Sequence, residues 1–483
     1  MNKKYALLIP ILLVALASSG QRVYSLDQII QLAKGQSPLA KQAETRKENR
    51  YWQYRFFKSN YNPQLALQGN LPGYNRDFNE NRLDDNTILF QEREQIRSSL
   101  NLGLFQPIAL TGGNISINSG TRLFEDFSAD VTQWNANLVN IRLNQPLFAF
   151  NRLKWDKLTQ PIRYEESKRE FVEEMEFVSR TAVNRFFDYL DAQVNYQIAG
   201  FNLANNDTIF NIETGRYNIG KTSEDKLLQV ELQLLTSQQD LAQAELDLQT
   251  SRLDLRTFIG LTENEEFELA LPLEIPLFEV DENKALNYAK KNRADFVAFE
   301  RRRLEALSEV AQAKGERFQM NLTGSFGLNA RGNTFNESYD DPTNQLVGNI
   351  TLDVPIINWG RNEARLKTAL ANQKLTSYII AQDQQNFEQE ILTQVRQLDV
   401  LQKQLEISRK SDEVAQKRYE IAQNRYLIGK IDITNLNIAL TEKDTAKRRY
   451  IGALRTYWIA YYDLRRLTLY DFANNELLYS SSD

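Results

Sequence analysis

The sequence predicts a mainly α-helical protein with a β-sheet part, built as a tandem repeat of helix, strands and a long coiled-coil helical hairpin. Three observations predict this class. A hexapeptide returns almost unchanged, as RYNIGK at 216–221 and RYLIGK at 425–430. Several short stretches alternate between apolar and polar residues, which is typical of strands with one apolar face. Two runs of more than 100 residues have helical spacing and only one break each.

The first 20 residues have the features of an export signal. Lys3 and Lys4 precede an apolar run from Ala6 to Ala17, and small residues follow. The run is shorter than the roughly 20 apolar residues of a spanning helix, so we expect export and cleavage rather than an anchor. We therefore expect the mature chain to act outside the cytoplasm.

The composition excludes several classes of function. The 483 residues include no Cys and no His, which removes thiol and imidazole catalysis, the Ser-His-Asp triad and zinc fingers. A net charge of −5 gives no general reason to expect a nucleic-acid partner. We expect no enzyme, and no catalytic, cofactor or metal site.

The repeat register extends far beyond the hexapeptide. From 216 to 425 the offset is 209 residues, and the same offset carries Pro146 onto Pro355 and Arg152 onto Arg361. Helical stretches at 25–58 and 281–314 open the two halves. The expected order is a signal peptide (1–20), helix (21–62), strands (63–147), helical hairpin (148–261), linker (262–282), helix (283–317), strands (318–357), helical hairpin (358–470) and C-terminal tail (471–483).

The strand stretches pose a problem of closure. Exported chains with such strands suggest an outer-membrane barrel, but each half offers only two to four strands. Because an open sheet edge cannot face lipid, we expect several copies to share one barrel. A soluble β-rich module carrying coiled coils is the alternative. The first half holds more strand-like sequence, and the arrangement of 72–133 stays open. Two polar stretches, 75–86 and 335–342, are extracellular loops or simple connectors.

Apolar residues recur at every seventh position in the long helical runs, which favours coiled-coil packing over an ordinary bundle. One arm, 151–214, would extend about 95 Å at ~1.5 Å per residue. The three heptad series are Leu227, Leu234, Leu241, Leu248 and Leu255; Ile391, Leu398 and Leu405; and Ile407, Val414, Ile421 and Ile428.

The segment GRYNIGKT at 215–222 fits the phosphate-loop pattern G-x-x-x-x-G-K-[ST], in which glycines admit phosphates and the lysine binds them. A phosphate loop follows a buried strand, whereas 195–214 is polar with helical spacing. The second copy keeps Gly429 and Lys430 but has neither a counterpart of Gly215 nor one of Thr222. We therefore expect no nucleotide, and we interpret Gly220 and Gly429 as the residues that end helices with a positive φ.

This organisation resembles the TolC-like outer-membrane efflux protein family over nearly the whole mature chain. The resemblance rests on the tandem halves, on the junctions QPLFAFNR (145–152) and VPIINWGR (354–361), and on the RYxIGK turns. It implies a homotrimer in outer-membrane lipid, with a 12-stranded barrel made of four strands per chain, continuing into an α-helical tunnel in the periplasm. It also implies a passive channel for efflux or type I secretion, which works with a periplasmic adaptor protein and an inner-membrane RND or ABC transporter.

The same resemblance assigns the two helix turns to the periplasmic tip of the tunnel, where the adaptor docks. The residues concerned are Arg216, Tyr217, Ile219, Gly220 and Lys221 in the first half, and Arg425, Tyr426, Ile428, Gly429 and Lys430 in the second. A purely structural role is the alternative: the glycines shape the turns, and the Tyr and Arg side chains pack.

The entrance differs from that of well-known family members, which close it with Tyr, Arg and a ring of aspartates. Ile431, Asn435 and Ile438 stand where an Arg and two aspartates are expected, with Asp432 and Asp225 near the turns. We expect these five residues to line a less acidic, more apolar entrance. The alternative function is a periplasmic coiled-coil adaptor or interaction protein, although such a protein has one hairpin rather than two. Cargo, transporter partner and gating are not encoded in any motif.

Overall fold

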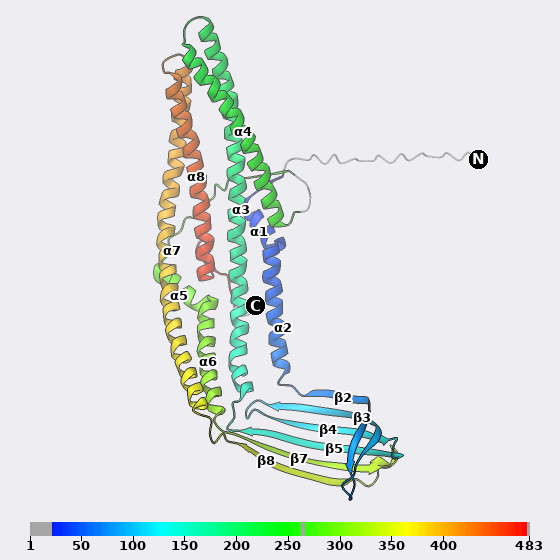
Figure 1. Cartoon of the computed structure of the whole chain (residues 1–483). Coiled ribbons are helices and arrows are strands. Elements are labelled where there is room, and N and C mark those ends of the chain that lie inside the picture. The colour runs from blue at the N-terminus through cyan, green and yellow to red at the C-terminus, as the bar shows by residue number, and fades with distance from the viewer. Residues whose placement is uncertain (1–21, 262–265, 481–483) are drawn as a thin grey trace, which may run out of the picture. The chain divides into compact units, whose positions relative to one another are not determined.

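The computed structural model describes residues 22–261 and 266–480 (Figure 1). The export signal expected at 1–20 lies outside the described residues. The chain forms two compact units. One combines residues up to 43 with 173–285 and 392 onward, and the other combines 44–172 with 286–391. Two long helices, α3 (Arg152–Asn218) and α7 (Arg361–Leu427), contribute to both units.

The second unit contains one antiparallel sheet of six strands, in the order β2-β3-β4-β5-β7-β8 (Figure 1). Its strands are β2 (Gln64–Arg82), β3 (Ile88–Ile108), β4 (Gly113–Asp126), β5 (Val131–Leu147), β7 (Gln319–Gly332) and β8 (Thr343–Asp353). The expectation of four strands per chain is therefore wrong. The polar stretch 75–86 is mostly the outer part of β2, and a 3-10 turn, Glu337–Tyr339, lies within 335–342.

The two extra strands are an insertion into the first copy of the repeat. Helices α2 (Pro38–Ser59) and α6 (Ala294–Gly315) both have 22 residues and start 256 residues apart, from 38 to 294. Helices α3 and α7 both have 67 residues and start 209 residues apart. The offset between the two copies is therefore 47 residues smaller after the strands than before them (256 − 209 = 47). The first copy thus has 47 more residues than the second between the start of its opening helix and the start of its long helix. Because β2 corresponds to β7 and β5 to β8, the insertion is the β3–β4 hairpin.

In the second unit the helices lie side by side in the same order as the strands they join. Helix α2 contacts α3, where the rings of Tyr54 and Tyr164 stack with centroids 4.5 Å apart. Helix α3 contacts α6 through the Arg301–Glu166 ion pair. Helix α6 contacts α7, where Phe296 and Phe387 meet edge to face at 4.9 Å. The order α2-α3-α6-α7 therefore matches β2, β5, β7 and β8, to which these helices connect.

The first unit contains the far ends of α3 and α7 and the helices that return from them, α4 (Glu224–Ile259) and α8 (Ile433–Thr468). It also holds α1 (Leu26–Gln36), the start of α5 (Glu282–Asn292), a two-stranded parallel sheet of β1 (Arg22–Tyr24) with β6 (Phe267–Leu269), and the C-terminal strand pair β9 (Tyr470–Asp471) with β10 (Glu476–Leu477).

Each opening helix of the repeat is in fact two helices. In the first half the break falls at Ser37, whose backbone is extended (φ −63°, ψ 147°) because Pro38 disfavours a helical residue before it. In the second half Arg293 is extended between α5 and α6. The expected linker 262–282 also contains β6, whose pairing with β1 across the chain was not predicted from the sequence.

A buried ion cluster ties helices together in the first unit. Arg465 of α8 contacts Glu176 of α3 at 2.8 Å and Asp471 of β9 at 2.5 Å, and Lys34 of α1 contacts the same glutamate. The two carboxylates are almost fully buried, and the arginine side chain is only 14% exposed. Among the described helices, none holds an apolar stretch long enough to cross a membrane.

Candidate functional site

The sheet of the second unit has two faces of opposite character. Following the pairing register straight across all six strands gives one unbroken apolar row: Leu65, Leu104, Ile117, Ile141, Phe326 and Leu346. These side chains are between 38% and 82% exposed. The row one residue further along lies on the opposite face and is small or polar: Ala66, Gly103, Asn118, Asn140, Gly327 and Gln345. Such a sheet suits lipid on one side and water on the other.

Large apolar side chains also stand at the junctions between this sheet and the helices. Phe148 follows β5 and is 73% exposed, while Ile356 and Trp359 follow β8 and are 92% and 95% exposed. These are the junction motifs that repeat along the sequence. Aromatic residues at the edges of an apolar band are typical of the membrane–water interface.

Both hairpins of the first unit turn by the same backbone mechanism. The α3–α4 turn has Gly220 at φ +70°, with the amide of Lys221 donating to the carbonyl of Arg216 at 2.8 Å. In the α7–α8 turn Gly429 has φ +73°, and Lys430 donates to the Arg425 carbonyl at 2.8 Å. Both are Schellman motifs, in which a left-handed residue ends the helix. The positive φ predicted for both glycines is confirmed.

Two tyrosines that are equivalent in the repeat have different environments. Tyr217 in the first turn is 40% exposed, whereas Tyr426 in the second is only 2% exposed. Tyr426 belongs to an apolar cluster that joins the two hairpins; its other buried members are Ile209, Val230, Tyr419, Ile433, Leu436 and Leu440. Packing therefore accounts for Tyr426, while Tyr217 remains available at the surface.

A buried polar contact completes this cluster. The hydroxyl of Tyr426 donates to Glu213 Oε1 at 2.8 Å, and Arg216 Nη1 donates to the same oxygen at 2.6 Å. The Arg216 guanidinium also lies 5.3 Å from the Tyr426 ring centre. We call Glu213, Arg216 and Tyr426 the tip latch, because they connect α3 to α7. Glu213 was not predicted, although its position three residues before Arg216 on a helix was a usable signal.

The latch alters the titration of its members. Burial alone would raise the pKa of Glu213, but hydrogen bonds from Tyr426, Arg216 and Thr222 outweigh burial, so its pKa is lowered. Burial and the hydrogen bond to Glu213 both raise the pKa of Tyr426. The glutamate is thus held as the anion and the tyrosine as the neutral donor, which is the pairing that makes a strong hydrogen bond.

The remaining predicted tip residues are mostly at the surface. Ile219 and Ile428, equivalent in the repeat, are 69% and 66% exposed, and Lys221, Arg425 and Lys430 are exposed beside them. Each turn thus presents an apolar residue flanked by basic ones.

Four of the five candidate entrance residues are exposed, and one is not. Asp225, Asp432, Asn435 and Ile438 lie on the surface, whereas Ile431 is half-buried against the apolar cluster. Asp432 caps α8 by accepting from the Asn435 amide at 3.0 Å. This backbone hydrogen bond is the largest cause of its lowered pKa.

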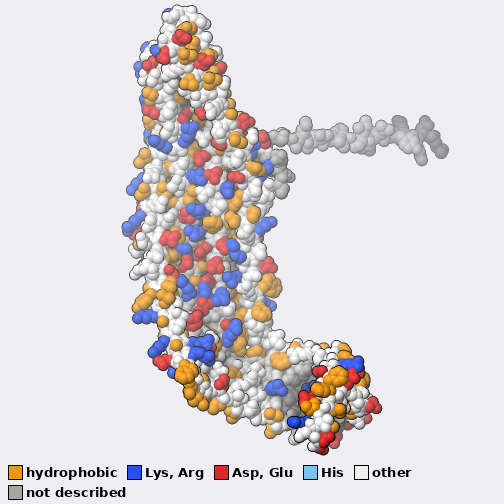
Figure 2. Space-filling view, viewed as in Figure 1, with side chains coloured by type: hydrophobic (Ala, Val, Ile, Leu, Met, Phe, Trp, Pro, Cys, Tyr) orange, Lys and Arg blue, Asp and Glu red, His pale blue; other side chains and the backbone are white. Residues whose placement is uncertain are grey.

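The helices of the first unit also carry exposed apolar stripes. On α7 and the residue that follows it, the stripe is the predicted heptad series Ile407, Val414, Ile421 and Ile428, each at least 55% exposed. On α4 it consists of Leu228, Leu232, Leu235, Leu246 and Leu253, each at least 51% exposed. The visible helical surface mixes acidic and basic side chains with scattered apolar ones (Figure 2). Heptad series that stay exposed in one chain fit coiled-coil packing against another.

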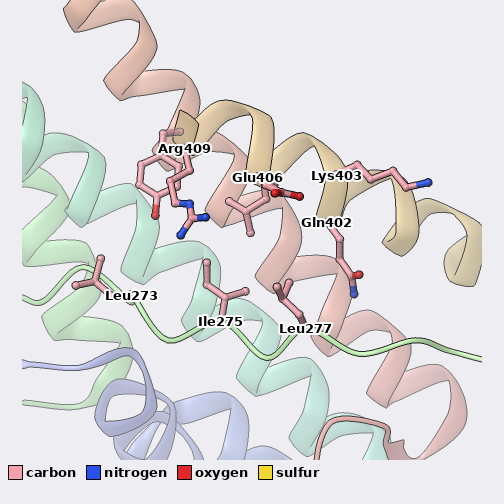
Figure 3. A pocket seen from close by; sticks show the side chains of 9 residues that line it. Leu273, Ile275, Leu277, Gln402, Lys403, Glu406 and Arg409 are labelled. Carbon is pink, nitrogen blue, oxygen red and sulfur yellow. The ribbon is translucent and has the colours of Figure 1, made fainter. Parts of the chain in front are cut away.

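A groove of about 580 Å³ lies between the segment after β6 and helix α7 (Figure 3). Leu273, Ile275 and Leu277 form one wall, and Glu406 and Arg409 are among the α7 residues opposite. The segment is fixed there by backbone carbonyls, since Phe278 accepts from Gln402 at 2.9 Å and Pro276 accepts from Tyr457. The groove is therefore the seam along which the connection between the halves packs.

Comparison with known structures gives the same fold over almost the whole chain. The Campylobacter jejuni CmeC outer membrane channel has 16% identity and a TM-score of 0.67, covering 95% of this chain and 87% of that one. The open state of the Neisseria gonorrhoeae MtrE outer membrane channel has 18% identity and a TM-score of 0.62, covering 92% and 88%. The Vibrio cholerae outer membrane protein VceC has 14% identity and a TM-score of 0.62, covering 92% and 95%.

No curated protein matches the chain. The sequence profile described as outer membrane efflux protein matches residues 29–261 and 285–468, which include both hairpins and the strands of the first and second halves. With this match and the two-faced sheet, the chain belongs to the outer membrane efflux protein family.

Proposed function

We propose that the chain is one protomer of a homotrimeric, passive channel-tunnel that serves a tripartite efflux or type I secretion system. Membership of the family places it in the outer membrane, with its helical part in the periplasm. The observation that carries the proposal is the sheet, which has an unbroken apolar row on one face, a row of small and polar residues on the other, and two edge strands, β2 and β8. A sheet with such edges is stable in lipid only when it closes into a barrel with further copies.

Self-association is also supported by the helices. The apolar stripes on α4 and α7 are different surfaces of one unit, so a contact between them joins unlike faces of two chains. Contacts of this head-to-tail kind close into rings when the rotation between neighbours is a simple fraction of a turn. Three copies would give a ring whose wall contains both hairpins of every chain.

At the tip, the two turns are proposed to dock a periplasmic adaptor protein, which links the channel to an inner-membrane RND or ABC transporter. The exposed pair Ile219 and Ile428, with Lys221, Arg425 and Lys430 around them, offers apolar knobs with basic rims. Knobs of this kind would insert into an apolar groove with an acidic border. The entrance itself is proposed to be lined by the exposed Asp225, Asp432, Asn435 and Ile438, with Ile431 packed behind them.

The channel proposal is tested with two neighbouring residues on opposite faces of β5. Ile141→Arg places a charge on the apolar row, where a charge at the bilayer midplane costs about 2–4 kcal/mol per chain. Asn140→Arg places the same charge on the polar row. We expect I141R to deplete the protein from the outer-membrane fraction, and N140R to insert and conduct in planar bilayers with altered ion selectivity.

Two results would contradict the proposal. Equal tolerance of both substitutions would mean that neither face meets lipid. Recovery of the unmodified protein only as a soluble periplasmic chain, with no conductance after reconstitution, would favour the adaptor alternative.

A further inference from the structure

We infer that three copies of this chain close an 18-stranded barrel, six strands from each, in which β8 of one chain pairs with β2 of the next. The inference rests on the proposed channel function and specifies its assembly. It assigns a role to the edges of the sheet and names their partner, a second copy of the same chain. It also replaces the 12-stranded barrel that the sequence resemblance implied.

The first step is that β3 and β4 belong to the barrel wall. The β2–β3 ladder is continuous from Gln64–Phe105 to Arg82–Ile88 apart from one bulge, and the β3–β4 ladder runs from Gln95–Asp126 to Ile108–Gly113. If β3 and β4 folded into the lumen as a plug, they would lose these hydrogen-bonded ladders and their apolar face would contact water. Strands in the barrel wall instead keep the ladders to their neighbours and turn the apolar face toward lipid.

The two faces of the inserted strands agree with this placement. Leu104 of β3 and Ile117 of β4 continue the apolar row at 38% and 44% exposure. Gly103 and Asn118 continue the polar row on the other side. The insertion therefore repeats the lipid-facing pattern of the strands on both sides of it, which a loop or plug has no reason to do.

The second step is that the two edges are complementary in direction. Strand β2 leads away from helix α2, and β8 leads toward helix α7, so the two edge strands run in opposite directions. A rotation about the barrel axis does not change whether a strand runs up or down along that axis. The β8 strand of one chain therefore lies antiparallel to the β2 strand of its neighbour. Every residue of β8 is exposed, including Leu346 at 82% and Ile350 at 65%. An even number of strands per chain is what antiparallel closure requires.

The third step compares widths within the second unit. Six strands spaced ~4.8 Å apart and tilted by ~40° span an arc of about 38 Å. Four helices packed side by side at ~8–10 Å span about 32–40 Å. Four strands would span only about 25 Å at the same spacing and tilt. The inserted hairpin thus brings the sheet to the width of the α2-α3-α6-α7 layer from which its strands emerge.

Strand number fixes the size of the barrel. At the same spacing and tilt, 12 strands give a backbone radius of about 12 Å and 18 strands about 18 Å. The cross-section enclosed by the backbone rises slightly more than twofold. The polar row that lines this lumen is small, with two glycines and an alanine among its six residues.

The test uses the absence of cysteine from the chain, so that every thiol is an introduced one. Gln68 of β2 is paired in turn with Gln345, Asn349 or Thr351 of β8, all on the polar face, as double cysteine variants. Mild oxidation of the purified, bilayer-active protein is followed by non-reducing electrophoresis. Gln68→Cys with Thr323→Cys is the matched negative control, because β7 lies one strand, about 4.8 Å, further from the edge. Asn321→Cys with Thr351→Cys is the positive control within one sheet.

We expect at least one β2–β8 pair to give a covalent ladder ending at three chains, none with the Thr323 control, and 18 strands in a cross-section imaged by electron cryomicroscopy in lipid nanodiscs. A ladder ending at two chains, a 12-stranded section, or trimers without any β2–β8 link would overturn the inference. In each of these cases conductance of the unmodified protein would persist, so the channel function would stand. Loss of conductance and of outer-membrane location would instead refute the proposed function.

Discussion

The tip latch yields a prediction whose size follows from its geometry. Tyr426→Phe removes one hydroxyl, 2.8 Å from Glu213, in a pair whose side chains are 2% and 5% exposed. The ring keeps its place in the apolar cluster, and Glu213 keeps its contact with Arg216. The substitution therefore reports the hydrogen bond with little loss of packing.

A hydrogen bond to a charged group contributes about 1.5–3 kcal/mol net, which corresponds to roughly 10- to 150-fold in a local opening equilibrium. We expect amide hydrogen exchange in both hairpin ends, 205–235 and 415–440, to accelerate by that factor in Tyr426→Phe, while exchange near the buried ion cluster of Arg465 stays unchanged. Mass spectrometry of peptides from the purified protein measures both regions in one experiment.

The repeat provides the control. Tyr217→Phe removes the same hydroxyl from the equivalent position, where the side chain is 40% exposed, and we expect no change in exchange. Equal acceleration in both variants, or none in Tyr426→Phe, would show that the contact does not hold the hairpins together.

The pH dependence of the latch follows from the lowered pKa of Glu213. A carboxylate with a lowered pKa stabilises above its ordinary range and loses that contribution as the pH falls through its folded-state value. The protection factor, which is the intrinsic exchange rate at each pH divided by the observed rate, should therefore fall at acid pH in both hairpin ends, and Glu213→Gln should remove this dependence.

Three further predictions concern stability. Burial raises the pKa of Asp191 to about 6, so thermal stability should fall as pH rises from about 4 through 6, and Asp191→Asn should abolish that fall. The chain has no His that could titrate in the same range. Persistence of the fall in Asp191→Asn would therefore refute the assignment. Gly429→Ala should cost about 1–2 kcal/mol at its positive φ, whereas Gly215→Ala, inside α3, should gain up to about 1 kcal/mol; similar shifts in denaturant midpoint would contradict the turn mechanism. Glu176→Ala should cost about 1.5–3 kcal/mol in chemical unfolding, because Arg465 loses one of its two buried carboxylates and keeps only Asp471. Glu363→Ala breaks an exposed pair and should cost under about 1 kcal/mol.

The helical half of the fold is predictable from the sequence because its signals are long and local. Seven-residue spacing continues over many turns, and a single glycine with a lysine after it marks each reversal. The expected hairpin breaks near 215–224 and 429 agree with turns at Gly220 and Gly429. The break at Ser37 was available as well, since the proline after it favours an extended residue.

The strand count was harder to predict because the alternation changes phase. Bulges between Asn70 and Gly73, Asn118 and Gly120, and Asn137 and Val139 shift the apolar positions from one parity to the other. A period-two reading that crosses a bulge loses its pattern, although the strand continues. The outer parts of β2 and β3 are also rich in charged residues, so their sequence looks like a loop.

The features of this chain that bear most on function lie where the two copies of the repeat differ. Helices of 67 and 36 residues recur in both copies, as the duplication requires. The two copies differ in two places. The first copy contains the additional strands β3 and β4, and it has Glu213 where the second copy has Ala422.

Each difference affects how parts of the assembly are joined: the first concerns the barrel, and the second concerns the contact between the two hairpins. The inserted strands set the width of the barrel that we propose, and the unmatched glutamate gives one hairpin a charged partner for the buried tyrosine of the other. The second copy cannot form the reciprocal pair, because Ala422 stands where a glutamate would be needed to contact Tyr217. Comparing the two copies of the repeat residue by residue is therefore the most direct way to find, from sequence, where a chain of this family has been adapted.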